Sequence, residues 1–175
     1  MSKIKIALVQ MHVEKDKYKN LETANTFIKK VAQEGCDLAI LPEMFTTPYK
    51  TDNLTIYAEF EGEDSFISIS NMAKENSIYL VGGSIPEKDE KNLVYNTSYV
   101  FDRNGNNIGK HRKVHLFDID VEGGQSFKES DTLTPGNNIT VFDTEFGKIG
   151  LCICFDFRFP ELARLMVQKY LQLLI

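Results

Sequence analysis

The sequence has few cysteines and no apolar run long enough to cross a membrane. Its three cysteines are an odd and sparse set, which is typical of a reducing compartment and argues against a disulfide framework. A bilayer-spanning helix needs about 20 apolar residues in succession, and no stretch approaches that length. The first residues also lack the apolar core of a secretory signal peptide. We therefore expect a cytoplasmic protein that does not act at a membrane.

The sequence also lacks an excess of positive charge. Its 20 lysines and arginines stand against 25 aspartates and glutamates, so the net charge is −5. Basic surfaces attract nucleic acids and anionic lipids, and we expect neither as a partner. Hydrophobic residues make up 42% and charged residues 26% of the 175 residues. This balance is that of a globular protein with one domain and a core of its own.

Apolar patterns indicate strands that alternate with helices at first and then come in pairs. Apolar residues recur every three or four positions in the helical segments, whereas the strand-like segments are short apolar or alternating runs. The expected elements are strands at 4–10, 37–41, 77–85, 92–101, 107–111, 139–143 and 148–155, and helices at 18–34, 64–76 and 160–171. This order predicts an α/β fold with a mixed β-sheet and helices on one face. The stretch 114–134 has no clear period and reads as a long loop, a feature that is usually functional.

Cys154 lies in the segment KIGLCICFDFRFPEL, which gives the strongest indication of chemistry. The apolar run before it predicts a strand, Pro160 opens a helix, and the turn between them presents the thiol. Open α/β sheets bind ligands at the carboxyl ends of their strands, so this thiol is a candidate nucleophile. A cysteine that only packs in the core is the alternative interpretation.

Two charged residues have the properties needed to act on such a thiol. Glu43 directly follows a buried strand in LPEMFTTPY, where a carboxylate can serve as a general base. Lys113 lies among apolar and aromatic residues in GKHRKVHLFDID. Its ammonium would stabilise a thiolate, and also the oxyanion that forms when the thiolate attacks a carbonyl or nitrile carbon. Taken singly, Glu43 is also explained as a turn carboxylate and Lys113 as part of a solvated basic cluster.

Together, thiol, carboxylate and ammonium predict acyl transfer through cysteine without a catalytic histidine. The three histidines, His12, His111 and His115, share no motif with a cysteine. One alternative is a redox or zinc-binding protein, because Cys152 and Cys154 are two apart on a strand and so share a face. No further clustered zinc ligands lie near them in the sequence. A binding module that only retains these motifs is a second alternative.

The three segments resemble the nitrilase, or carbon–nitrogen hydrolase, superfamily, and the resemblance covers nearly the whole chain. Its LPE, RKxHLFD and C-[YF]-D-x-R-F-P-E motifs contain Glu43, Lys113 and Cys154 in this order. The resemblance implies that these residues are the general base, the oxyanion stabiliser and the nucleophile. It further implies that Glu129, in SFKES, is a second supporting glutamate. The backbone N–H of Phe155 would be another oxyanion donor, and no metal or organic cofactor is implied.

Within the superfamily, the segments are most similar to the omega-amidase branch. That branch hydrolyses the terminal amide of alpha-keto acid amides such as 2-oxoglutaramate and 2-oxosuccinamate, so we expect a small-molecule amide as substrate. Tyr49 and Arg158 would then help to bind a substrate carboxylate. Arg158 is equally explained by an ion pair with Asp156 or Glu161, and Tyr49 by packing in a loop. Another amidase, or an N-carbamoyl hydrolase, would use the same catalytic residues.

The resemblance also implies the extent of the fold. Members of the superfamily form a four-layer αββα sandwich and continue well past the helix that follows the cysteine. We therefore expect residues 1–175 to be the N-terminal part of a carbon–nitrogen hydrolase domain, half of such a sandwich. The remaining part would supply further pocket residues and much of the dimer surface. We expect a homo-oligomer, with a catalytically inactive fragment as the alternative for this chain.

Overall fold

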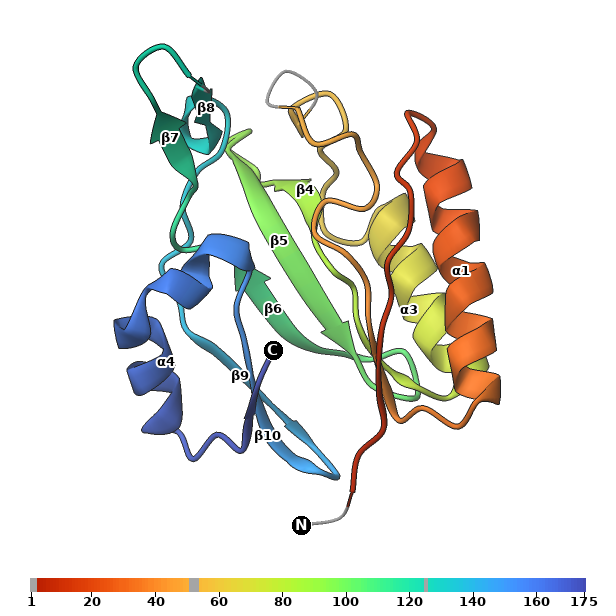
Figure 1. The fold of residues 1–175 in the computed structure, drawn as a ribbon. Coiled ribbons are helices and arrows are strands. Elements are labelled where there is room, and N and C mark those ends of the chain that lie inside the picture. The colour runs from red at the N-terminus through yellow and green to blue at the C-terminus, as the bar shows by residue number, and fades with distance from the viewer. Residues whose placement is uncertain (1–2, 51–53, 125) are drawn as a thin grey trace.

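Two main β-sheets packed face to face, with helices on their outer sides, form the body of the chain, and a separate two-stranded sheet lies beside them (Figure 1). A computed structural model describes residues 3–50, 54–124 and 126–175. The larger sheet contains β1 (Ile6–Leu8), β2 (Leu38–Ile40), β3 (Tyr79–Val81), β4 (Ile85–Lys88), β5 (Val94–Phe101) and β6 (Asn107–Arg112). The smaller sheet contains β9 (Thr140–Thr144), β10 (Gly147–Leu151) and β11 (Leu173–Leu174). The helices are α1 (Lys17–Gln33), α3 (Asp64–Asn76) and α4 (Pro160–Val167), with short 3₁₀ turns η1 (Glu129–Asp131) and η2 (Cys154–Arg158).

The larger sheet is mixed, as the sequence predicts. Strands β1, β2 and β3 are parallel neighbours, and Ala39 of β2 pairs with Ala7 on one side and Leu80 on the other. The chain then turns back, and β5 is antiparallel to β3, β4 and β6. Parallel strands need crossover connections, which α1 and α3 provide. The carboxyl ends of β2 and β3 therefore lie at the same edge of the sheet.

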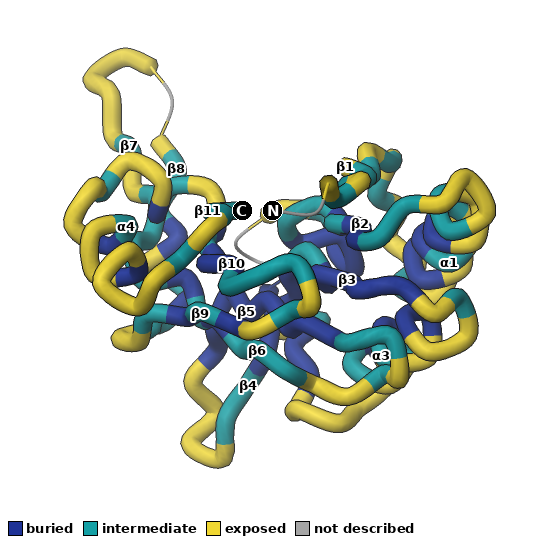
Figure 2. The backbone as a smooth tube through the Cα atoms, turned by 90° about the horizontal axis from the view of Figure 1, so that it is seen from below, coloured by how far each residue is buried: buried dark blue, intermediate teal, exposed yellow. Residues whose placement is uncertain are grey.

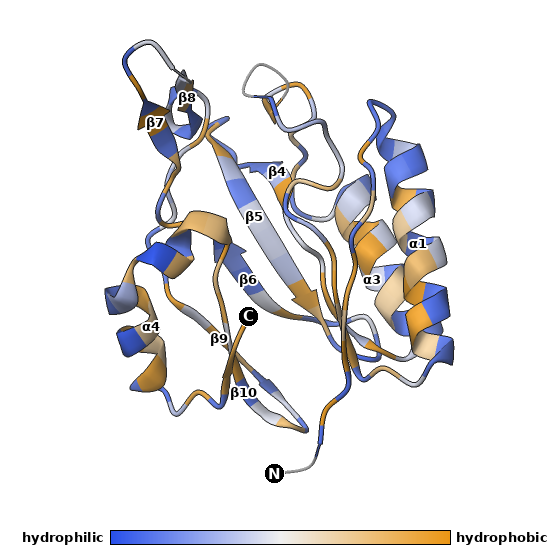
Figure 3. Ribbon diagram, viewed as in Figure 1, coloured by the Kyte–Doolittle hydropathy of each residue, from blue (hydrophilic) through white to orange (hydrophobic). Residues whose placement is uncertain are grey.

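Helix α1 begins and ends at positions that its sequence specifies. The Asp16 carboxylate accepts hydrogen bonds from two N–H groups of the first turn, which caps the helix. Leu21, Ala24 and Ile28 follow at helical spacing and are buried against the sheet. Gly35, with φ +74°, ends the helix in the left-handed conformation that glycine adopts without strain. Figure 3 shows the resulting alternation of hydrophilic and hydrophobic residues along the helix.

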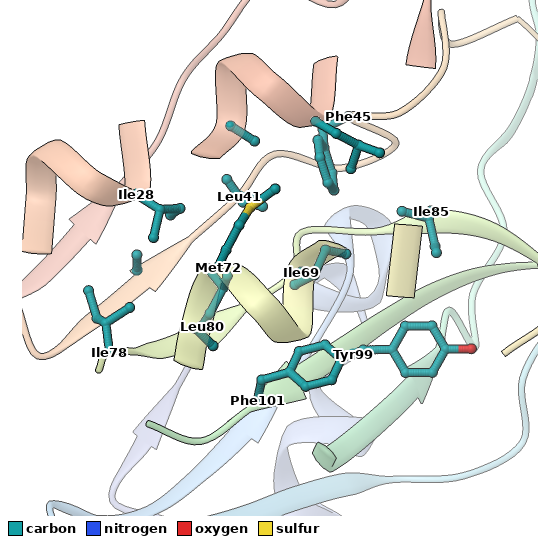
Figure 4. Close-up of a cluster of buried hydrophobic side chains, with 14 residues drawn as sticks. Ile28, Leu41, Phe45, Ile69, Met72, Ile78, Leu80, Ile85, Tyr99 and Phe101 are labelled. Atoms are coloured by element: carbon teal, nitrogen blue, oxygen red, sulfur yellow. The ribbon is translucent and has the colours of Figure 1, made fainter. Parts of the chain in front are cut away.

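The hydrophobic core has two main layers. One lies between α1, α3 and the larger sheet, where Phe101 and Tyr99 meet apolar residues of both helices (Figure 4). The other lies between the sheets, where Val100 of β5 joins Phe142 and Ile149 of the smaller sheet. Buried residues are accordingly concentrated in the central strands, whereas exposed ones lie on the outer faces of the helices and in the loops and turns (Figure 2).

Helix α4 covers the outer face of the smaller sheet and completes an α–β–β–α order of layers. Met166 is fully buried, and a Cβ atom added to Gly150 of β10 would lie 2.9 Å from its sulfur. Leu162 is buried beside it, whereas Leu165 and Tyr170 are exposed. The layers are therefore those of an αββα sandwich, the fold of which the sequence predicts residues 1–175 to form half. Within the described residues, no helix is long and apolar enough to cross a membrane.

The structure corrects several predicted elements, beginning with the first strand, which spans Ile6–Leu8 instead of 4–10. The strand predicted at 77–85 is two strands, β3 and β4, and residues 82–84 between them belong to neither. The loop predicted at 114–134 contains the paired strands β7 (Asp118–Asp120) and β8 (Ser126–Lys128). The strand expected to reach residue 155 ends at Leu151, and the last helix ends at Val167. The ends of β10 and α4 could not be predicted, because the apolar residues continue past them. Periodicity alone does not indicate where a strand or helix stops.

Gly83 permits a close approach on which the Glu43 segment depends. Its φ is +56°, and a Cβ atom there would lie 2.0 Å from the carbonyl oxygen of Pro42. Gly83→Ala is therefore expected to lower the free energy of unfolding by about 2 kcal/mol or more, measured by urea denaturation. Gly62→Ala is the matched control, because φ is +90° there and nothing lies within 4 Å. Equal losses in the two variants would show that the contact with Pro42 is unimportant.

Candidate active site

The register of the β5–β6 pair places a row of polar side chains in the space between the sheets. Ser98 pairs with His111, and the Lys113 N–H donates to the Asn96 carbonyl at 2.8 Å. Side chains alternate across a strand, so Asn96 and Ser98 share the face of Val100, which lies in the core between the sheets. This row is buried, and it ends at the edge where β2 and β3 finish.

Lys113 lies at the centre of the site and is fully buried. Its Nζ donates to Oε1 of Glu43 at 3.0 Å and to Oε1 of Glu129 at 2.9 Å. Its backbone is fixed as well, because the Gly136 N–H donates to its carbonyl at 2.8 Å. An ammonium has three N–H donors, and within the described residues two of them have partners. One donor therefore remains for a group that enters the site.

Glu43 stands just after the end of β2, at the sheet edge where this row of polar side chains ends. Its Oε1 accepts hydrogen bonds from Asn96 Nδ2 at 2.7 Å and from Lys113. Within the described residues, no N–H or O–H group donates to its second oxygen. The side chain is 25% exposed, so this oxygen is open to a substrate or a water molecule.

Glu129 is the most enclosed carboxylate of the site. Its Oε1 accepts from Lys113 and from the Tyr49 hydroxyl, and its Oε2 accepts from the Phe117 N–H at 2.8 Å. Burial raises the pKa of Glu129 to about 7, the Phe117 N–H opposes this rise, and the charge on Glu43 adds to it. Glu129 thus binds the Lys113 ammonium and is itself shielded from solvent.

Cys154 is the first residue of η2 and has a left-handed backbone, with φ +46°. A residue other than glycine rarely adopts this conformation, and such strain gathers at functional sites. Its side chain is exposed to a cleft of about 730 Å³, and it also lines a cavity of about 140 Å³ beside Glu43. Burial raises the pKa of the Cys154 thiol, as do the charge and the hydrogen bond of Glu43, whereas the Lys113 ammonium lowers it.

The four side chains thus meet from four separate segments of the chain. The site holds a thiol on a strained backbone, an accessible carboxylate oxygen, and an ammonium with one donor left among the described residues. The sequence of this chain also matches the carbon–nitrogen hydrolase family over residues 5–175. The chain belongs to the carbon–nitrogen hydrolase family.

Curated and solved relatives of this carbon–nitrogen hydrolase agree with that assignment. A hydrolase of Schizosaccharomyces pombe is 48% identical over 94% of this chain and 52% of its own length. The omega-amidase NIT2 of Mus musculus is 47% identical over 100% of this chain and 63% of its own length. The crystal structure of Nit3 from Saccharomyces cerevisiae, a member of branch 10 of the nitrilase superfamily, superposes with a TM-score of 0.87. It is 44% identical and covers 98% of this chain and 62% of that one. The chain thus spans between about half and two thirds of the length of these relatives.

The structure of the carbon–nitrogen hydrolase chain also shows where the remaining predicted residues lie. The Phe155 N–H is in the first turn of η2, where amide groups have no partner inside the helix. Arg158 lines the cleft beside Cys154, and within the described residues it forms no ion pair with Asp156 or Glu161. The Tyr49 hydroxyl donates a hydrogen bond to Glu129, and Tyr49 is not among the residues that line this cleft.

Two residues that position the site were not singled out from the sequence. Asn96 holds the Glu43 carboxylate, and Asp156 is fully buried between the Lys113 loop and the Cys154 turn. Asp156 lies in the cysteine motif, so its place there was a usable signal. For Asn96 the signal is weaker, because it depends on the β5–β6 register.

The geometry gives little support to the alternative of a thiol pair or a zinc site. Burial raises the pKa of Cys152 to about 11, and the nearby charge of Asp156 adds to the rise, so its thiol stays protonated at neutral pH. Within residues 3–50, 54–124 and 126–175, no group of three or more histidines, cysteines or carboxylates is arranged to hold a metal ion.

Proposed function

We propose that this carbon–nitrogen hydrolase cleaves the terminal amide of a small carboxylate-bearing molecule through a thioester on Cys154. The observation that carries the proposal is the buried Lys113 ammonium, held between the carboxylates of Glu43 and Glu129 beside the thiol. A fixed cation in a water-poor site stabilises a developing oxyanion far more than it would in bulk water. The same arrangement has no evident use in a protein that only binds.

In the proposed mechanism, Glu43 takes the thiol proton, directly or through a water molecule, and the Cys154 sulfur attacks the amide carbon. The electron pair of the carbonyl moves to its oxygen, which the free donor of Lys113 and the Phe155 N–H then hold. Glu43 returns the proton to the nitrogen, the carbon–nitrogen bond breaks, and ammonia leaves a thioester behind. Glu43 next takes a proton from water, the hydroxide attacks the thioester, and the carboxylic acid and the thiol are restored.

The expected substrate class follows from the cleft and from the relatives. Arg158 is an exposed cation at the cleft that contains the thiol, and a guanidinium binds a carboxylate in a two-pronged geometry. Several relatives 46% to 49% identical to this chain are named omega-amidases. We therefore propose 2-oxoglutaramate or 2-oxosuccinamate as substrate. Another amide or an N-carbamoyl compound is the second candidate, since the reacting groups would be the same.

The setting of the enzyme is proposed from the length of its relatives, its surface and its composition. Because the relatives are longer, we propose that residues 1–175 form the N-terminal part of a carbon–nitrogen hydrolase domain. Exposed apolar side chains on η2, on α4 and just beyond it, namely Phe157, Leu165, Val167 and Tyr170, fit a homo-oligomer. The low cysteine content fits a cytoplasmic location.

The test is ammonia release from 2-oxoglutaramate by the purified chain, with Cys154→Ala as the control. We expect release by the wild-type chain and none by the variant. Release from an N-carbamoyl amino acid, but not from 2-oxoglutaramate, would favour the second candidate. A folded chain that releases ammonia from neither substrate would contradict the proposed activity for this chain.

A further inference from the structure

Asp156 is a fully buried carboxylate that touches both halves of the site without facing the cleft. On one side, its Oδ1 accepts hydrogen bonds from the N–H groups of Val114 and His115, at 3.2 and 2.8 Å. These two residues directly follow Lys113. The His115 ring adds a contact at 2.8 Å and stacks on Phe159, with ring centroids 3.7 Å apart.

On its other side, Asp156 binds the turn that carries the nucleophile. Its Oδ2 accepts from the Ile153 N–H at 3.1 Å, and its own N–H donates to the Ile153 carbonyl at 3.0 Å. Ile153, which these two hydrogen bonds hold, immediately precedes Cys154. The left-handed backbone of Cys154 needs support from its surroundings. Oδ2 also meets Nε2 of His111 at 2.9 Å, and Nδ1 of that ring lies 3.1 Å from Thr140.

We propose that Asp156 is a positioning residue. It joins Val114 and His115, the start of the loop after Lys113, to Ile153, which begins the Cys154 turn. This lock would keep the oxyanion donor and the thiol at a fixed separation. The proposal rests on the proposed function for its catalytic meaning. An ionised carboxylate only accepts hydrogen bonds, and here all the polar groups around it can donate. Burial alone would raise the pKa of Asp156, but the hydrogen bonds of His111 and His115 bring it below its ordinary value, so the charge persists at neutral pH.

Asp156→Asn is expected to remove one hydrogen bond of this lock, the one that the Ile153 N–H donates. The asparagine oxygen can replace Oδ1 and keep the Val114 and His115 bonds. Its NH₂ group then stands where Oδ2 was, and His111 can accept from it by moving its ring proton to the nitrogen near Thr140. The Ile153 N–H instead faces another donor. The variant therefore leaves one buried donor unsatisfied, next to the nucleophile.

The experiment compares hydrogen exchange and turnover in the wild-type chain, in Asp156→Asn and in Asp102→Asn. The last variant makes the same charge change in an exposed turn, where Asp102 binds Asn104 and Asn106. For Asp156→Asn we expect amide exchange to rise about tenfold or more in peptides covering 152–156, with a smaller rise in 113–117. The rest of the chain is expected to be unchanged. On 2-oxoglutaramate, kcat is expected to fall by roughly tenfold to a hundredfold, with KM within about threefold.

Three results would overturn the proposal. They are unchanged exchange in 152–156, a uniform rise over the whole chain, and a loss confined to KM. If Asp156→Asn does not fold, His115→Ala replaces it, because His115 is partly exposed and its loss leaves the Asp156 backbone contacts in place. That variant should raise exchange in 152–156 by several-fold, and no rise would count against the lock. Hydrogen exchange decides the matter even if the chain releases no ammonia, so failure of the proposed activity stays distinguishable.

Discussion

Replacing Lys113 with alanine is expected to lower kcat/KM for ammonia release by about a hundredfold or more. One oxyanion donor is worth about 2.7–4 kcal/mol in the transition state, and Lys113 is the only cation in contact with both carboxylates among the described residues. The loss also leaves Glu129 buried without its counter-ion. Breaking such a buried pair costs about 3–5 kcal/mol of folding free energy, so urea denaturation should show a clear loss of stability as well.

Lys148→Ala is the matched control for this prediction. Its Nζ also pairs with a carboxylate, Asp143 at 2.8 Å, but both side chains are exposed. The change should leave turnover intact and alter the free energy of unfolding by no more than about 0.5 kcal/mol. Near-normal turnover in a folded Lys113→Ala chain would show that the ammonium does not stabilise the oxyanion.

Replacing Glu43 with glutamine is expected to lower kcat by about a hundredfold to ten-thousandfold. General acid–base catalysis by a positioned side chain contributes this much, and an amide cannot take the thiol proton. Glutamine keeps the size of the side chain and an oxygen for the hydrogen bonds from Asn96 and Lys113. The fold should therefore persist, which circular dichroism and the thermal midpoint would check. Glu75→Gln, on the exposed side of α3, should leave turnover unchanged.

The same Glu43→Gln variant should make the thiol more reactive toward iodoacetamide. Burial and the Glu43 charge raise the pKa of Cys154, and Lys113 lowers it. Removal of the carboxylate charge leaves the ammonium, so the pKa should fall and more thiolate should be present at neutral pH. Mass spectrometry of the alkylated Cys154 peptide over a series of pH values would measure the shift. Unchanged alkylation in the variant would mean that the Glu43 charge does not act on this thiol.

The residues of the site could be predicted from the sequence because each lies at the end of a recognisable segment. Glu43 follows β2, Lys113 follows β6, and Cys154 follows β10, and strands of packed sheets end near one another. Their motifs fixed the family, and helix α3 has the predicted bounds because its apolar face is regular. The backbone strain at Cys154 was not visible, since the apolar run continues past the end of β10.

The contacts that hold these residues could not be predicted, because they depend on register. Asn96 reaches Glu43 only because β5 and β6 pair as they do, and a shift by one residue would turn it to the other face. The Asp156 contacts join positions about 40 residues apart in the chain. Tyr49 was expected to help bind a substrate carboxylate or to pack in a loop, and neither interpretation indicated that its hydroxyl donates to Glu129, 80 positions further along. Sequence patterns indicate which face of a helix or strand is buried and where the element ends. Hydrogen-bond partners that are distant in the chain depend instead on tertiary packing.

The central claim is that Cys154 carries a covalent acyl group, and the mass of the chain during turnover tests it most directly. The chain is mixed with 2-oxoglutaramate, quenched in acid, and digested for mass spectrometry. We predict that the peptide containing Cys154 gains the mass of the substrate less ammonia, and that Glu43→Gln shows no such adduct. Ammonia release that continues in Cys154→Ala, or an adduct found only on another residue, would contradict the account.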